Sequence, residues 1–210
     1  QTSSLSELTT VTTGVVTIAA SGPCTYDDLV KLQTKIANTV ATLVTADFSG
    51  LQLSGNSSFS FDNLFKDCKL LQTVKLPAAG TDVTTTMRST FSGCNALKTI
   101  ENLEKLTHTT NSDATFYGCK ALTLITLPIP SGTYETSFNS TFLSCAALDS
   151  VANIGKYSLI SNASKTFSQI HSRAKLDLSQ WTFTSNAVAE HCFQYSSVFF
   201  LHLPLQKSEN

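Results

Sequence analysis

Cysteine is the reactive residue type whose positions in this sequence follow a rule. A metal site or a redox pair needs cysteines close together, as in Cys-x-x-Cys, or histidines at ligand spacing, and the sequence has neither. A regular position in a repeat instead faces the interior, where a free cysteine behaves as a small apolar side chain. We therefore expect burial, with a disulfide or metal site as the alternative, for the four cysteines that recur at one repeat position: Cys68, Cys94, Cys119 and Cys145. Cys24 and Cys192 should lie at opposite ends of the molecule and cannot pair.

The remaining reactive residues form no known catalytic pattern. The sequence contains no His-Glu-x-x-His pair for zinc, no Gly-x-Ser-x-Gly around a nucleophilic serine and no glycine-rich phosphate loop. We expect no catalytic, metal-binding or cofactor-binding residues, with a triad assembled from separate repeats as the alternative. The histidines are expected in surface or turn positions: His108, His171, His191 and His202.

The composition limits the partners and the location of the chain. Its 210 residues include 14 basic and 15 acidic side chains, so no excess of positive charge is available to hold a phosphate backbone. We expect no nucleic-acid partner. Because no apolar run approaches the roughly 18 residues of a membrane-spanning helix, we also expect no membrane span. A polar surface built from Thr, Ser and Asn is typical of secreted β-rich proteins and favours an extracellular or cell-surface location.

A sequence repeat organises most of the chain. Segments such as TFSGCNALKTIENL from Thr90 and TFYGCKALTLITLP from Thr115 share one pattern, in which Phe, Cys, Leu and a β-branched residue follow one another at intervals of three. The fifth copy has Ile170 in the cysteine position, and the sixth is one residue shorter before its Leu-Pro. The phenylalanines recur at nearly equal intervals, which alternate in length by a single position: Phe65, Phe91, Phe116, Phe142, Phe167 and Phe193. A period of this length is the signature of stacked structural repeats.

Each copy ends in a short alternation that predicts a β-strand. Val74 and Leu76 are apolar and would point inward, whereas Thr73 and Lys75 would point outward. Prolines often close the strand, where they cost no interior hydrogen bond. The Thr-rich segments 82–87 and 133–138 predict a second extended side on each coil.

Stacking is what makes such a repeat stable. One coil cannot bury its Phe, Leu and Ile alone, but neighbours about 5 Å apart turn these side chains into continuous ladders. We therefore expect a mainly β repeat solenoid of about six coils, each of roughly 25–26 residues, that forms one continuous structural domain. Residues 61–210 would form the repeats and residues 1–60 an N-terminal cap.

The repeat resembles the BspA-like leucine-rich repeats. The family's unit reads roughly Ala-Phe, two residues, Cys, two residues, Leu, two residues, Ile, one residue, Leu-Pro, and the similarity covers about residues 60–204, with Thr in place of the small residue before Phe. It implies a leucine-rich-repeat-like, right-handed stack. Members are cell-surface or secreted proteins of host-associated bacteria and some protozoa and are often adhesive, so the resemblance implies a non-enzymatic binding module. The unit here is longer than the commonest form and the last two copies have drifted, which bears on the ligand more than on the fold.

The N-terminal part predicts a helix between two strands. Thr25 followed by Asp28 is similar to a capping box, and an apolar face runs from Leu29 to Val40, so residues 26–39 should form a helix laid over the first coil. Residues 14–20 and 43–48 are expected to be strands. Because Phe48 precedes Val74 by one repeat length, the second of these strands is expected to be a degenerate first coil, with Phe48 in the position of Val74.

The outward strand positions are the candidate ligand face. They vary in chemistry between coils, as a surface for a protein or glycan ligand would, and their mixture of Lys, Glu and Asp suits a protein better than a polyanion. A structural surface repeat or spacer without a specific ligand is the alternative. We call these positions the outer strand face: Thr73, Lys75, Thr99, Glu101, Leu124, Thr126, Ser150, Ala152, Lys175, Asp177, Phe200 and His202.

The C-terminal coil predicts an open end. A terminal coil leaves apolar positions and strand edges uncovered unless something caps them, and only a short polar segment follows Pro204. We expect that the natural chain continues or that two copies form an end-to-end homodimer through this coil. Internal capping by Trp181 and Phe183 is the alternative.

Overall fold

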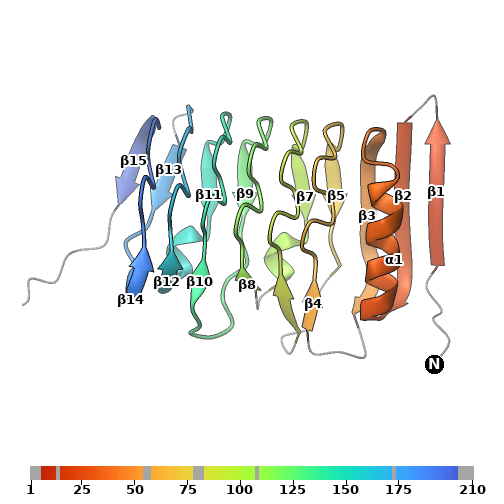
Figure 1. Ribbon diagram of the computed structural model, residues 1–210, viewed down its shortest axis with the longest axis horizontal. Coiled ribbons are helices and arrows are strands. Elements are labelled where there is room, and N and C mark those ends of the chain that lie inside the picture. The colour runs from red at the N-terminus through yellow and green to blue at the C-terminus, as the bar shows by residue number, and fades with distance from the viewer. Residues whose placement is uncertain are drawn as a thin grey trace, which may run out of the picture.

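The computed structural model describes residues 6–12, 15–53, 58–77, 83–106, 109–171 and 174–202; of residues 6–12, 15 and 199–202 it describes the backbone alone. Coils are stacked side by side along the long axis, with the helix near one end and the last strand at the other (Figure 1). The elements, in chain order, are β1 (Ser6–Thr12), β2 (Val15–Cys24), α1 (Tyr26–Ala37), β3 (Leu43–Leu53), β4 (Ser58–Ser60), β5 (Thr73–Lys75), β6 (Thr84–Thr86), β7 (Thr99–Glu101), η1 (Leu103–Lys105), β8 (Thr109–Asn111), β9 (Leu124–Thr126), β10 (Thr136–Ser137), β11 (Ser150–Ala152), η2 (Ile154–Lys156), β12 (Leu159–Asn162), β13 (Ala174–Asp177), β14 (Thr182–Val188) and β15 (Val198–His202), where η marks a 3-10 helix.

Each coil contributes one strand to each of two faces of the stack. One face carries the sheet β1-β2-β3-β5-β7 followed by the sheet β9-β11-β13-β15, and the other carries β4, β6, β8, β10, β12 and β14 as a six-stranded sheet. Neighbouring strands are parallel, apart from the antiparallel pair of β1 and β2. The Thr-rich segments do form the second side of the coil, as β6 and β10. The mainly β repeat solenoid with an N-terminal helical cap is therefore confirmed.

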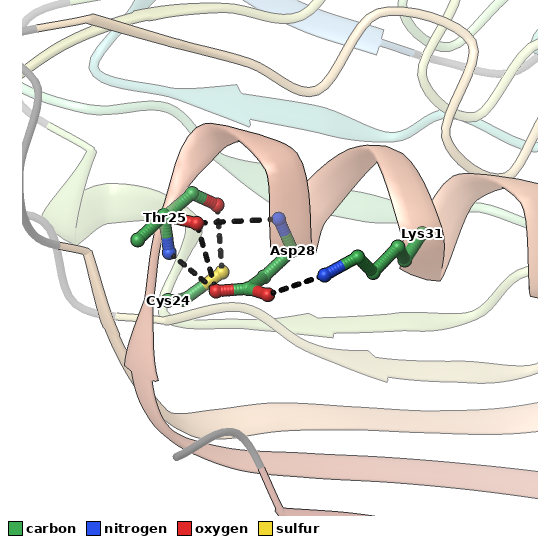
Figure 2. Close-up of polar contacts among 4 residues, drawn as sticks. All are labelled: Cys24, Thr25, Asp28 and Lys31. Carbon is green, nitrogen blue, oxygen red and sulfur yellow. Dashed lines mark hydrogen bonds and ion pairs between the residues drawn. The ribbon is translucent and has the colours of Figure 1, made fainter. Parts of the chain in front are cut away.

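The helix begins at the predicted capping box. The backbone amide of Asp28 donates to Thr25 Oγ1 at 3.4 Å, and the amide of Thr25 donates to Asp28 Oδ2 at 3.1 Å (Figure 2). The face that contains Leu29, Leu32 and Ile36 is buried, as the spacing predicted. The helix ends at Ala37, two residues earlier than expected, whereas β2 and β3 both extend further than expected. Strand β1, which pairs with β2, was not predicted.

The expected register of the degenerate first coil was wrong by two residues. Ala46, not Phe48, is paired with Val74 in the parallel ladder between β3 and β5. Phe48 therefore lies farther along the coil, where its ring centroid is 5.7 Å from that of Phe65. The short Ala46 side chain occupies the strand position that pairs with Val74. The ring of Phe48 instead begins the column of phenylalanine rings that continues at Phe65.

The phenylalanines form the predicted buried ladder. From Phe65 to Phe167 successive ring centroids lie 5.4–5.7 Å apart and the rings are stacked nearly parallel. Phe193 continues the series at 5.5 Å from Phe167. Because burial of an aromatic side chain is the largest single apolar contribution a coil can make, this column stabilises the stack along its whole length.

Two turn positions in every coil have a left-handed backbone. They flank the phenylalanine, and in the repeats of Phe65 to Phe167 their amides donate to carbonyls of the following coil, for example Asp67 N to Ser92 O at 2.7 Å and Ser144 N to Ser168 O at 3.0 Å. Only two of the twelve positions are glycine, so at most of them an intercoil hydrogen bond offsets the modest cost of a positive φ. The positions are residues 63, 67, 89, 93, 114, 118, 140, 144, 165, 169, 191 and 195.

In four of the six repeats the residue before the phenylalanine is a threonine, and it is a buried hydrogen-bond donor. Its hydroxyl donates to a carbonyl of the preceding coil, as in Thr90 to Phe61 O at 2.9 Å and Thr166 to Phe138 O at 2.8 Å. This contact explains why Thr replaces the small residue usual at this position in the resembling family: the side chain is still small, and its polar atom is satisfied.

Trp181 fills a space that the drift of the fifth coil creates. In the coil after that of Phe138, the position equivalent to Phe138 is occupied by the small Ala163. The amide of Ala163 donates to Val188 O of the following coil. The indole stacks on Phe138 at 5.7 Å and donates from Nε1 to Ile154 O at 3.0 Å. Trp181 is 2% exposed, so it belongs to the core.

Candidate ligand-binding face

The outer strand face points away from the core in every coil whose side chains are described. In β9 and β13 the buried Ile125 and Leu176 alternate with exposed neighbours, and Leu124 is 58% exposed. Ten of the twelve positions are exposed or half-buried, which confirms the predicted orientation. Phe200 and His202 lie in β15, where the structure describes the backbone alone.

The strand register brings the outward residues of neighbouring coils together. Lys75 is paired with Glu101, and their charged atoms lie 3.5 Å apart. An exposed ion pair of this kind adds less than about 1 kcal/mol to stability. The pair places an ammonium group and a carboxylate side by side on the exposed surface. In β13, Asp177 Oδ1 accepts the amide of Ser179 at 3.0 Å, which fixes the direction of this exposed carboxylate.

Ladder pairing along this face is uneven. Strands β5 and β7 share three residue pairs, and so do β9 and β11. The pairing of β11 with β13 has one residue pair, Ser150 with Lys175. Between β7 and β9, all of whose residues are described, the sheet is interrupted. Strand pairing on this face is therefore weak between β7 and β9 and again between β11 and β13, two coils further along the stack.

A hollow lies at each of these two junctions. The first, of about 350 Å³, is lined by β7 and β9 residues together with Lys98 and Glu104. The second, of about 540 Å³, is lined by β11, η2 and β13 residues together with Gln180. Both volumes are within the range of small-ligand sites. Sequence reasoning missed Lys98, Glu104, Lys156 and Gln180, although the alternating spacing of the phenylalanines carried the signal of a two-coil period.

The four repeated cysteines are buried, as expected, and the thiols of three of them bond to the preceding coil. A thiol donates to the phenylalanine carbonyl of the preceding coil: Cys94 to Phe65 at 3.0 Å, Cys119 to Phe91 at 3.2 Å and Cys145 to Phe116 at 2.9 Å. Burial raises the pKa of Cys68 and of Cys145 to about 12, so these thiols stay protonated at neutral pH. The drifted sixth coil has Ser196 in this position, and its hydroxyl donates to Phe167 O.

The other reactive residues form no cluster in the part of the chain that the structure describes. His171 and His191 are exposed, whereas His108 and the side chain of His202 lie outside the described residues. No group of three or more His, Cys, Asp or Glu side chains among the described residues could hold a metal ion. Within the same ranges, the structure has no helix long and apolar enough to cross a membrane.

These coils, ladders and outward strand positions define a β-solenoid repeat protein with an exposed strand face. Residues 61–198 match the model of the BspA type leucine-rich repeat region in six copies, which covers more than half of the chain. The chain therefore belongs to the BspA-type leucine-rich repeat family, a class of surface repeat proteins with potential for protein interaction. A comparison of the chain with curated proteins found no match, and neither did a comparison with solved structures.

Proposed function

We propose that this chain is a non-enzymatic binding module of a cell-surface or secreted protein and that it binds a protein or glycan ligand through the outer strand face. One observation carries the proposal: the inward residues of β5, β7, β9, β11 and β13 are similar from coil to coil, whereas the outward ones are not. The inward side is constrained by packing. The outward side presents hydroxyl, carboxylate, ammonium and apolar groups on a rigid support, which is what recognition of a heterogeneous surface needs.

The experiment is a binding screen followed by a matched pair of variants. The purified protein is tested against matrix proteins and a glycan array. Any ligand found is then measured against Lys75→Ala/Glu101→Ala/Lys175→Ala and against a control triple with the same change of charge outside the face. The control is Arg88→Ala/Glu135→Ala/Lys165→Ala, three exposed positions. We expect weakened binding by the first triple alone, with both proteins folded. Loss of binding in the control triple alone would place the binding site outside the face, and a screen without any specific ligand would favour a structural spacer.

Location outside the cell is the second part of the proposal. It is supported by membership of a family of surface repeat proteins and by a surface rich in Thr, Ser and Asn. A protease added to intact source cells should cleave the protein or release it, and antibody should label unpermeabilised cells. Labelling that requires permeabilisation would contradict this part.

We also propose that the C-terminal coil associates with a second copy. Trp181 is buried, as internal capping would require, but apolar side chains of this coil remain open to solvent: Phe183 is 47%, Val188 43% and Tyr195 73% exposed. Among the described residues, strands β14 and β15 are the last strands of their sheets, and the edge of a sheet favours pairing. Sedimentation at several concentrations should show a reversible dimer that Val188→Asp weakens. A strict monomer at all concentrations would favour capping from within.

A further inference from the structure

The two hollows of the outer strand face are equivalent sites that recur every two coils. Ile100, Glu104 and Thr126 at the first hollow correspond to Val151, Gly155 and Asp177 at the second, all at one constant offset in the sequence. The 3-10 helices η1 and η2 differ by the same offset. Each helix follows a left-handed asparagine, Asn102 or Asn153, whose side-chain amide donates to a carbonyl of the preceding coil at 2.9 or 2.8 Å.

The two junctions differ in strand pairing and in the residue in the middle of the 3-10 helix. A Cβ on Gly155 would come within 2.6 Å of the carbonyl oxygen of Asp177, so glycine lets β13 approach η2. Glu104 occupies the same position at the other junction, where the sheet is interrupted. A Cβ at this position of the helix, as at Gly155, needs more room than a closely paired strand leaves.

The spacing of the hollows fits an extended polypeptide. Two coils rise by about 10 Å along the stack, and roughly three residues of an extended chain span the same distance. A peptide that runs along the long axis, across the strands, therefore brings side chains three positions apart to the two hollows. The hollows differ in chemistry, so their order defines a motif.

The first hollow favours an apolar side chain and the second an acidic one. At the first, Leu124 offers an exposed apolar surface, and the charges of Lys98 and Glu104 balance. At the second, Lys156 and Lys175 outnumber Asp177. A carboxylate placed there would meet a net charge of one positive unit, because Asp177 offsets one of the two ammonium groups.

We infer that the outer strand face binds an extended segment of a protein partner that carries an apolar residue and, about three positions away, an acidic residue. The inference rests on the proposed function and names its ligand class. The Leu124 hollow takes the apolar side chain, and the hollow beside Lys175 takes the carboxylate.

The test uses fluorescein-labelled Ser/Gly peptides that contain one Leu and one Asp, in both orders, measured by fluorescence anisotropy. We expect the tightest binding when the two residues are roughly three positions apart. The same pair placed side by side, or at about twice that spacing, should bind more weakly because only one hollow is filled at a time. Equal affinity for all spacings, or no binding by any peptide, would overturn the inference.

Substitutions assign each end of the peptide. Lys175→Glu should weaken binding of the Leu/Asp probe roughly fivefold and strengthen binding of a Leu/Lys probe. Lys165→Glu, an equal change of charge outside the hollows, is the matched control. For the apolar end, Leu124→Ser should weaken binding, whereas Ile129→Ser should not, since Ile129 is 54% exposed but lines neither hollow. An unchanged preference between the Asp and Lys probes after Lys175→Glu would contradict the assignment.

Failure of this inference is distinguishable from failure of the proposed function. Suppose that a glycan binds the protein, binds the triple variant of the outer strand face more weakly and is not displaced by the Leu/Asp peptide. The face would then still be the binding surface, but an extended peptide would not be its ligand. A ligand insensitive to the triple variant would exclude the face itself.

Discussion

The rings of Phe116 and Phe142 are stacked at 5.4 Å between centroids with planes 11° apart, although they lie one full repeat apart in the chain. Phe116 is stacked in the same way on Phe91 on its other side. One side chain in the middle of the column therefore contacts two coils at once, and its loss affects both junctions.

Truncation of that ring should destabilise the whole stack. We predict that Phe116→Ala lowers the free energy of unfolding by about 3–5 kcal/mol, because it leaves a cavity between two rings. Urea denaturation followed by circular dichroism measures the change. Tyr117→Ala alters a neighbouring aromatic residue that is exposed and should have a much smaller effect. Equal effects of the two substitutions would contradict a buried ladder.

The buried threonine hydroxyls should contribute through hydrogen bonds between coils. Thr166→Val keeps the shape of the side chain but removes the donor to Phe138 O, so we predict a loss of about 1 kcal/mol. Thr133→Val makes the same chemical change at an exposed position and should be nearly neutral. Thermal unfolding of both variants beside the parent protein decides the matter; a neutral Thr166→Val would mean that the hydroxyl is dispensable.

The buried cysteines predict a loss of stability at high pH. In the unfolded chain a thiol ionises near its ordinary pKa of 9.0, whereas burial raises the pKa of Cys145 to about 12 in the folded protein. The unfolded state loses its proton first, so the stabilising contribution is complete below pH 9 and is lost as pH rises towards 12.

A serine variant isolates the contribution of one thiol to this pH dependence of the unfolding free energy. Cys145→Ser retains a donor to Phe116 O, as Ser196 does in the sixth coil, but does not ionise. Between about pH 9 and 11 the unfolding free energy of the parent should fall more steeply than that of the variant, by up to about 1.4 kcal/mol per pH unit. Parallel pH profiles for the two proteins would show that this thiol is not protected from ionisation.

Gly155 should tolerate no side chain, although its backbone is not left-handed. We predict that Gly155→Ala costs about 1–3 kcal/mol, because the new Cβ meets the Asp177 carbonyl. Gly132→Ala is the matched control, since a Cβ there meets nothing within 4 Å. Denaturation midpoints of the two variants check this prediction. A neutral Gly155→Ala would mean that β13 can move away without loss.

The sequence was sufficient for the features that repeat and insufficient for those that do not. The ladder from Phe65 to Phe167, the inward cysteines and the outward Lys75 follow from one period and from the alternation of a strand. Strand β1 pairs by its backbone and leaves no periodic trace. The register of Phe48 was missed because the first coil lacks the repeat's Cys and Leu, so that only spacing was available to align it.

The hollows depended on differences between coils that look alike in sequence. In the repeats of Phe65 to Phe142, coils that end in Leu-Pro, such as that of Pro77, alternate with coils that end in an asparagine and a 3-10 helix, such as that of Asn102. The strand pairing at these two junctions then differs together with one residue, Glu104 or Gly155. The effect of such a single residue depends on contacts between coils, and those contacts exist only in the folded chain. The sequence alone therefore does not reveal the hollows.

The most direct test of the outer strand face compares two side chains in the same coil. Leu124 is 58% exposed on the face and Ile129 is 54% exposed outside it, so each is open to hydroxyl radicals in the free protein. Footprinting by mass spectrometry, with and without a protein ligand from the binding screen, reads both in one experiment. We predict that the ligand protects Leu124 from oxidation and leaves Ile129 unchanged. Protection of Ile129 with Leu124 still reactive would contradict the account.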